Sequence, residues 1–180
     1  MGAAIGAVFG LVYVWVNAGE LPSGMSLILR ALGVAAFAGL VVMLVVRRND
    51  AAGSGDRPDR TVFGRRYCTV VILEVIALFG GLRVITGPLD APEASVAWVS
   101  VVVGVHFVAL AAVWDNPFVH WLGVAITLCG AIGLVLAIAG APRASIAVLS
   151  GVVPGAILLG TGWWFALGRG DPTPGRSGTS

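Results

Sequence analysis

Six stretches of this chain are apolar and almost free of charge over the length that a membrane crossing needs. A bilayer core of about 30 Å requires roughly 20 apolar residues in a helical crossing. Five of the stretches reach that length, and the first is a little shorter. We therefore predict an all-α integral membrane bundle of six transmembrane helices, at about residues 3–17, 25–46, 67–87, 94–114, 118–140 and 145–167.

The composition agrees with this membrane class. Of the 180 residues 58% are hydrophobic and 11% are charged, and the mean hydropathy is +0.96. A soluble domain carries about 25% charged residues. We therefore expect one transmembrane domain, residues 1–168, with short connections and no soluble domain. Residues 169–180 are rich in Gly, Pro, Ser and Thr and are expected to form a disordered cytoplasmic tail.

Positive charge is concentrated in the loop predicted at residues 47–66. All 11 basic residues of the chain are arginines, and six of them lie in this loop beside three aspartates. The positive-inside rule places such a loop in the cytoplasm, which puts both termini there as well. The expected location is a bacterial inner membrane, and binding of nucleic acid is not implied. Anionic lipid headgroups are expected partners of the arginines that flank the helices, namely Arg47, Arg48, Arg65 and Arg66.

Two ionisable groups lie deep inside predicted helices, Glu74 in the third and His106 in the fourth. At a rise of 1.5 Å per residue both are roughly 10–12 Å from the cytoplasmic ends of their helices. Consecutive helices joined by a short loop usually pack side by side, so we expect a hydrogen bond or ion pair between the two side chains. Thr127 lies at a similar depth in the fifth helix. The sequence therefore predicts an intramembrane polar cluster of Glu74, His106 and Thr127.

This cluster has a structural and a functional interpretation. A charged side chain in hydrocarbon costs about 2.5–3.5 kcal/mol on insertion scales, so it needs a partner or a purpose. Polar contacts between membrane helices often serve packing alone, and a clasp that fixes the register of two helices is the simpler interpretation. A carboxylate beside an imidazole is also suited to proton coupling or to general acid–base chemistry.

Other charged residues are expected at the membrane interfaces. Arg30 and Arg83 are each about 16 residues from the cytoplasmic ends of their helices, which places both near the outer headgroups. Their long side chains can extend into that region. Asp115 lies at the inner turn between the fourth and fifth helices, where it can cap a helix or pair with Arg65 or Arg66.

Tryptophan and small residues indicate how the helices are anchored and packed. All six tryptophans fall at or near predicted helix ends, which is typical of aromatic belts at membrane interfaces. Small residues recur every four positions in the first and sixth helices and line one face of the fifth, so helices can approach closely there. Packing inside the bundle is the simpler interpretation. Homo-oligomerisation through Gly2, Gly6 and Gly10 is the alternative.

The run from Arg65 through Glu74 to the Gly-Val-His-Phe motif at residues 104–107 resembles a group of small actinobacterial multi-pass membrane proteins. The resemblance covers mainly the third to fifth predicted helices. It implies the membrane class and draws attention to Glu74 and His106. It implies no activity, because the group has none established. Ala109 stands where relatives often have proline, so a proline kink is not implied here.

No motif in the chain names a reaction. The two histidines, His106 and His120, lie at different depths, and neither a catalytic triad nor a phosphate loop is found. We therefore predict no catalytic residue, cofactor or metal. The expected role is a non-enzymatic accessory or interaction protein, with the lipid bilayer and a membrane protein or second copy as partners. A proton-linked small-molecule transporter or permeation protein using Glu74 and His106 is the alternative, and a membrane-embedded lipid or isoprenoid enzyme is a further one.

Overall fold

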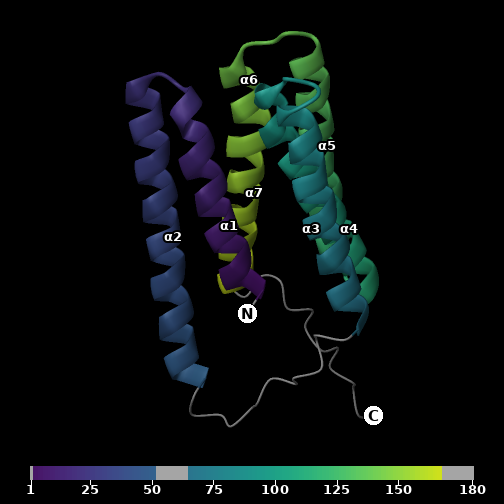
Figure 1. Cartoon of the computed structure of the whole chain (residues 1–180). Coiled ribbons are helices and arrows are strands. Elements are labelled where there is room, and N and C mark those ends of the chain that lie inside the picture. The colour runs from purple at the N-terminus through teal and green to yellow at the C-terminus, as the bar shows by residue number, and fades with distance from the viewer. Residues whose placement is uncertain (1, 52–64, 168–180) are drawn as a thin grey trace.

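The computed structural model describes residues 2–51 and 65–167, which are almost entirely helical and contain no strand. The long helices alternate in direction along a single bundle (Figure 1). Their bounds are Gly2–Asn17 for α1, Ser23–Ala51 for α2, Arg65–Thr86 for α3, Ser95–Trp114 for α4 and Pro117–Ile138 for α5. The last rod consists of α6 at Arg143–Ala147, the π-helical turn η4 at Val148–Val152 and α7 at Val153–Ala166. Single turns, η1 at Ala18–Glu20 and η3 at Pro92–Ala94, complete the described elements.

Within the described residues, five helical segments are long and apolar enough to cross a membrane. They are Ser23–Val46, Thr69–Thr86, Pro92–Trp114, Pro117–Ile138 and Arg143–Ala166. The outward surface agrees with a lipid environment, since Ile76 and Phe79 on α3 are 63% and 65% exposed. The first predicted crossing, α1, is helical over 16 residues and is shorter than these five segments. The described chain is therefore a helical, apolar bundle with the character of a multi-pass membrane protein.

Two helices extend into the loop that was predicted at residues 47–66. Helix α2 continues to Ala51, past the predicted end at residue 46, and α3 begins at Arg65 instead of residue 67. Hydropathy marks the end of the apolar core, whereas a helix can continue into the headgroup region, where arginine is a good helix former. Residues 52–64, the predicted tail at 169–180, and the side chains of Arg47, Arg48, Arg65 and Arg66 lie outside the described residues.

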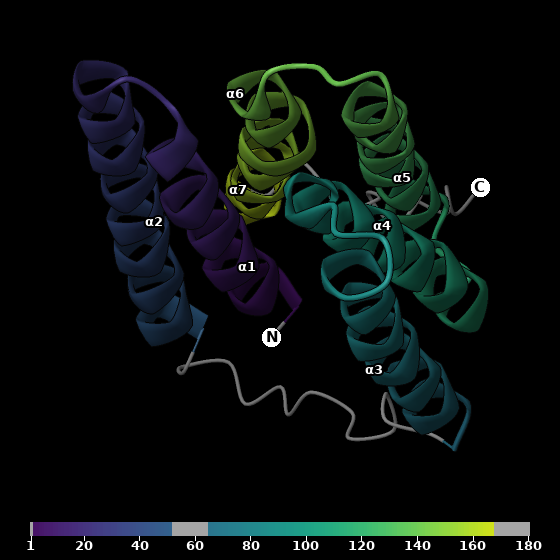
Figure 2. The same ribbon diagram turned by 45° about the horizontal axis from the view of Figure 1, so that its top comes forward.

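The helices form two groups joined by the last rod. Helix α1 lies between α2 and α7, while α3, α4 and α5 lie on the other side of the bundle (Figures 1 and 2). One end of the bundle, which we call the loop end, holds the start of α1, the end of α2, the start of α3 and the end of α7. The opposite end holds η1, η3 and α6. This alternation agrees with the order of crossings predicted from the sequence.

Glycine contacts hold the closest helix pairs together. On α1, a Cβ atom at Gly10 would lie 2.8 Å from the backbone oxygen of Gly155 on α7, so the two backbones nearly touch. Helices α4 and α5 meet in the same way, with Gly104 against Thr127 and Gly130 against Val101. Of the predicted small-residue faces, those of the fifth and sixth helices are thus used inside the bundle, and the first helix uses Gly10, whereas a Cβ atom at Gly6 would meet nothing within 4 Å. The predicted antiparallel pairing of the fourth and fifth helices is confirmed.

A proline explains the π-helical turn in the last rod. Pro154 has no N–H to donate to the carbonyl of Ser150, four residues earlier, and its ring crowds that carbonyl. The carbonyl instead accepts a hydrogen bond from the Ser100 hydroxyl of α4. The Ser150 hydroxyl in turn donates to the Cys129 carbonyl of α5, at 3.1 Å. The irregular turn therefore ties α4, α5 and α7 together at mid-bundle.

Candidate functional site

The structure places Glu74 and His106 in contact. Oε2 of Glu74 on α3 lies 2.8 Å from Nδ1 of His106 on α4, and the side chains are 22% and 14% exposed. Nδ1 is buried and has no well-directed hydrogen-bond acceptor among the described residues. The carboxylate oxygen therefore approaches the ring away from the direction of its N–H. A hydrogen bond requires a nearly straight N–H···O angle, whereas the attraction between opposite charges does not. When His106 is the positively charged imidazolium, the contact is therefore best described as an ion pair.

Trp98 sets the spacing between the two helices that carry this pair. Its indole N–H, on α4, donates to the Ala77 carbonyl of α3 at 3.2 Å. The ring occupies the space left by the missing side chain of Gly81. Ala77 is one helical turn from Glu74, so this contact fixes the height of the carboxylate on α3. Trp98 was expected only to anchor the chain at the membrane interface, and it also joins two helices.

Glu74 and His106 lie in the wall of a pocket of about 590 Å³ near the loop end, which we call the Glu74 pocket. Helices α1, α3, α4, α5 and α7 all contribute to its lining. The walls are mostly apolar and include the aromatic side chains of Phe9, Phe107, Trp114, Phe118 and Phe165. Phe118 of α5 and Phe165 of α7 pack edge to face within this lining, with ring centroids 5.1 Å apart.

The charge of the Glu74 pocket is asymmetric. Glu74 is the one acidic residue in its described lining, and His106 is the one group there that can become positive. Arginine and lysine are absent from that lining. When the imidazole is neutral, the carboxylate is therefore a single negative charge in an apolar, aromatic-walled space, where electrostatic attraction is stronger than in water.

Thr127, the third predicted member of the polar cluster, lies apart from the ion pair. Its hydroxyl donates to the Gly123 carbonyl of its own helix at 2.8 Å, and its side chain packs against Gly104 of α4. In the described part of the chain no hydrogen bond links it to Glu74 or His106. The three residues were grouped because they have similar depths in the membrane. Depth does not tell whether Glu74 on α3 and Thr127 on α5 contact the same side of α4.

Each of the interface charges with a described side chain has a local role. The Nε–H of Arg30 donates to the Trp15 carbonyl at 3.1 Å, and the guanidinium lies 5.3 Å from the centroid of the Trp15 ring, so Arg30 joins α2 to α1. Arg83 is exposed in the last turn of α3, where a positive charge favours the helix dipole. Asp115 ends α4 in the left-handed conformation, with φ of 50°.

Sequence reasoning missed the aromatic lining of the Glu74 pocket and the burial of Tyr13, which is 6% exposed. Phe9, Phe118 and Phe165 lie on three helices that are far apart in the sequence, and nothing in their spacing shows that they converge. Tyr13 did carry a signal. It is the one tyrosine inside the first apolar segment, and a buried tyrosine hydroxyl usually has a hydrogen-bond partner. Its position therefore indicates a polar neighbour on another helix.

Comparison of the chain with protein-family models, with curated proteins and with solved structures finds no match in any of the three. The resemblance to actinobacterial membrane proteins at residues 104–107 therefore stays a prediction. The function has to be inferred from the geometry of Glu74, His106 and the pocket around them.

Proposed function

We propose that the protein is a proton-linked carrier of small organic cations, with Glu74 and His106 as the groups that exchange the proton for the cation. The observation that carries the proposal is the 2.8 Å contact between these side chains in the wall of a 590 Å³ pocket. A polar clasp that serves packing alone would need no such pocket. An accessory role was expected from the sequence, and the pocket is what favours transport over it.

The substrate class follows from the pocket walls. Aromatic faces attract cations, and five aromatic side chains contribute to the lining. The Glu74 carboxylate supplies the opposite charge. An anion would meet neither a guanidinium nor an ammonium group in the described lining. A cation with an apolar body therefore complements both the shape and the charge of this space.

Proton coupling follows from competition for one carboxylate. With a proton on His106, the imidazolium neutralises Glu74 and the pocket holds no net charge. An organic cation that binds Glu74 takes the place of that positive charge, and the proton leaves the imidazole for water. Release of the cation allows the proton to return. Each transport cycle would thus move one cation against one proton, and a ligand that binds one protonation state better than the other shifts the balance between them.

The orientation that we propose puts the loop end in the cytoplasm of a bacterial cell, in the inner membrane. Six arginines at residues 47–66 support this side under the positive-inside rule. The arginines that flank the helices, Arg47, Arg48, Arg65 and Arg66, would then lie near anionic headgroups. The Glu74 pocket lies at that end and would open toward the cytoplasm.

Uptake by proteoliposomes tests the proposal. A suitable probe is radiolabelled 2-phenylethyltrimethylammonium, because its fixed charge prevents it from crossing the bilayer as a neutral base. Vesicles that are acidic inside and alkaline outside should accumulate the probe faster than vesicles at equal pH. Glu74→Gln should lower uptake to the rate of protein-free vesicles, since the amide keeps the shape of the side chain and loses its charge.

Asp115→Asn is the matched control for that substitution. It removes a carboxylate from the same end of the bundle, outside the pocket lining, and asparagine tolerates the left-handed backbone at this position. Its uptake should equal that of the wild type. Equal uptake by wild type and Glu74→Gln, or the same rate with and without the pH gradient, would contradict the proposal.

A further inference from the structure

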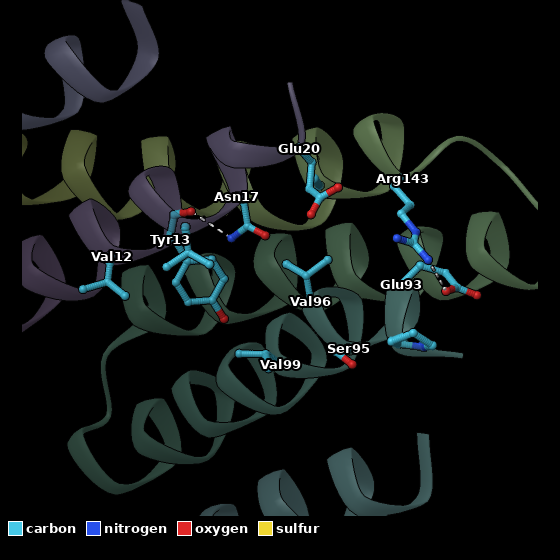
Figure 3. Close-up of a pocket in the computed structure, with 12 residues that line it drawn as sticks. Val12, Tyr13, Asn17, Glu20, Glu93, Ser95, Val96, Val99 and Arg143 are labelled. Carbon is cyan, nitrogen blue, oxygen red and sulfur yellow. Dashed lines mark hydrogen bonds and ion pairs between the residues drawn. The ribbon is translucent and has the colours of Figure 1, made fainter. Parts of the chain in front are cut away.

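A second pocket, of about 450 Å³, lies toward the end of the bundle that holds η1, η3 and α6. Figure 3 shows the residues that line it. We call it the Tyr13 pocket. Its apolar walls come from valines of α1 and α4, namely Val12, Val16, Val96 and Val99. Polar side chains line the rest of it, from α1, η1, η3, α4 and α6. Nothing in the sequence analysis singled out these residues as a group.

Two hydroxyl groups in this lining are buried without a hydrogen-bond partner among the described residues. They are the phenol of Tyr13 and the hydroxyl of Ser95. Tyr13 as a whole is only 6% exposed. The Ser100 hydroxyl lies near the phenol and donates its own proton to the Ser150 carbonyl, so toward the phenol it can act only as an acceptor, and the lone pairs of the phenol oxygen stay without a donor. Buried hydroxyls without partners are rare in folded proteins, because each has lost its hydrogen bonds to water. Both groups line the same cavity, so one bound molecule can satisfy both.

The charged groups of the Tyr13 pocket favour a positively charged occupant. Glu20 and Glu93 line it together with Arg143, so carboxylates outnumber the guanidinium. Nη2 of Arg143 lies 3.8 Å from Oε2 of Glu93. The dashed line in Figure 3 marks this ion pair. Glu20 has no ion-pair partner in the described residues, and in Figure 3 its carboxylate lies on the same side of the pocket as Arg143. One negative charge is therefore left for a ligand.

We infer that the Tyr13 pocket is a second binding site, for a primary ammonium ion with an apolar body. The ammonium N–H groups donate to the oxygens of Tyr13 and Ser95, and Glu20 balances the charge. The valine walls contact the apolar body. A quaternary ammonium, which has no N–H, leaves both hydroxyls unsatisfied, so the site discriminates between these two kinds of cation.

Binding at the second site does not depend on the proposed function. Its location, however, adds to that function. Helices α1 and α4 line both pockets, and the two linings are about one helical turn apart on each helix, from Phe9 to Val12 and from Val103 to Val99. Tyr13 follows Val12 on α1 and lines the Tyr13 pocket on the side nearer to Phe9. The Tyr13 pocket would then be the entry or exit site at the other end of one path.

Calorimetric titration of the full-length protein with 2-phenylethylamine tests the inference. The experiment uses the Glu74→Gln background, so that binding at the Glu74 pocket does not contribute. Binding of the amine should persist there and be at least tenfold tighter than that of its N-trimethyl derivative. Tyr13→Phe, which removes only the hydroxyl, should weaken amine binding on the order of tenfold. Ser95→Ala and Glu20→Gln should weaken it as well.

Asp90→Asn is the matched control for Glu20→Gln. Asp90 is exposed at the same end of the bundle, lies outside the lining and has a positive φ that asparagine tolerates. Amine affinity should be unchanged in this variant, and all variants should unfold at the same temperature without amine. Absence of amine binding in the Glu74→Gln background would overturn the inference, as would affinity that is unaffected by Tyr13→Phe, Ser95→Ala and Glu20→Gln. Neither result bears on cation uptake through the Glu74 pocket, which is measured separately.

Discussion

Glu74 and His106 face each other across the contact between α3 and α4, with Oε2 and Nδ1 separated by 2.8 Å. This pair is the one acid–imidazole contact in the described part of the chain. It lies in the wall of a pocket, where under the proposed function a proton on His106 and a bound cation would compete for the charge of Glu74. An ionisable pair inside an apolar bundle therefore lines a space large enough for a small ligand.

Replacement of His106 by glutamine should uncouple uptake from the pH gradient. Glutamine keeps a polar side chain beside Glu74 but takes up no proton near neutral pH. Proteoliposomes with His106→Gln should still take up the quaternary probe at equal pH, and a gradient of one pH unit should give no further acceleration. His120→Gln is the control, since His120 is exposed at the start of α5 outside the pocket. An unchanged gradient effect in His106→Gln would show that another group carries the proton.

Gly130→Ala should destabilise the pairing of α4 with α5. A Cβ atom at this position would lie 2.6 Å from the backbone nitrogen of Val101, and a backbone atom cannot move aside as a flexible side chain can. The expected loss is about 1–3 kcal/mol of unfolding free energy, the usual range for overpacking. Unfolding in detergent, followed by circular dichroism, measures it.

Gly160→Ala provides the comparison for that variant. Gly160 also lies inside a helix, but nothing is within 4 Å of its added Cβ. This variant should be as stable as the wild type or more stable by up to about 1 kcal/mol, because alanine is the better helix former. Equal effects of the two substitutions would contradict the backbone contact between α4 and α5.

Trp163→Phe should loosen α2 from α7. The indole N–H of Trp163 donates to the Ala36 carbonyl at 3.0 Å, and its ring packs on Gly39. Loss of the hydrogen bond should cost about 0.5–1.5 kcal/mol. The neighbouring Trp164 is 47% exposed and makes no described hydrogen bond, so Trp164→Phe should cost less. If the two variants unfold along the same curve, the hydrogen bond from Trp163 to Ala36 contributes nothing measurable to stability.

Cysteine labelling in intact cells should place the two ends of the bundle on opposite sides of the membrane. In a chain with Cys68 and Cys129 changed to serine, a membrane-impermeant maleimide should react with Leu89→Cys, which is exposed in the connection between α3 and α4. It should react with His120→Cys, near the loop end, only after the cells are broken. The reverse pattern would place residues 47–66 outside the cell and refute the proposed orientation.

Much of the architecture could be predicted from the sequence. Long apolar runs fixed the positions of the helices to within a few residues, because hydrocarbon tolerates almost no other kind of segment. The short turn at Asp115 and Asn116 required α4 and α5 to be antiparallel neighbours. The shared depth of Glu74 and His106 followed from the constant rise of a helix, and it brought attention to the contact that the structure contains.

The tertiary structure decided which side of each helix faces which neighbour. Lipid tails are as apolar as leucine, so hydropathy does not distinguish a lipid-facing side from a buried one. For that reason the sequence grouped Thr127 with Glu74 and His106, treated Trp98 and Trp163 as interface anchors, and gave no sign that Phe9 and Phe165 share a pocket. The rotations of α1, α4, α5 and the last rod are set by backbone contacts at Gly10, Gly104 and Gly130 and by the carbonyl that Pro154 leaves free. These contacts join residues far apart in the chain, and a linear pattern does not encode them.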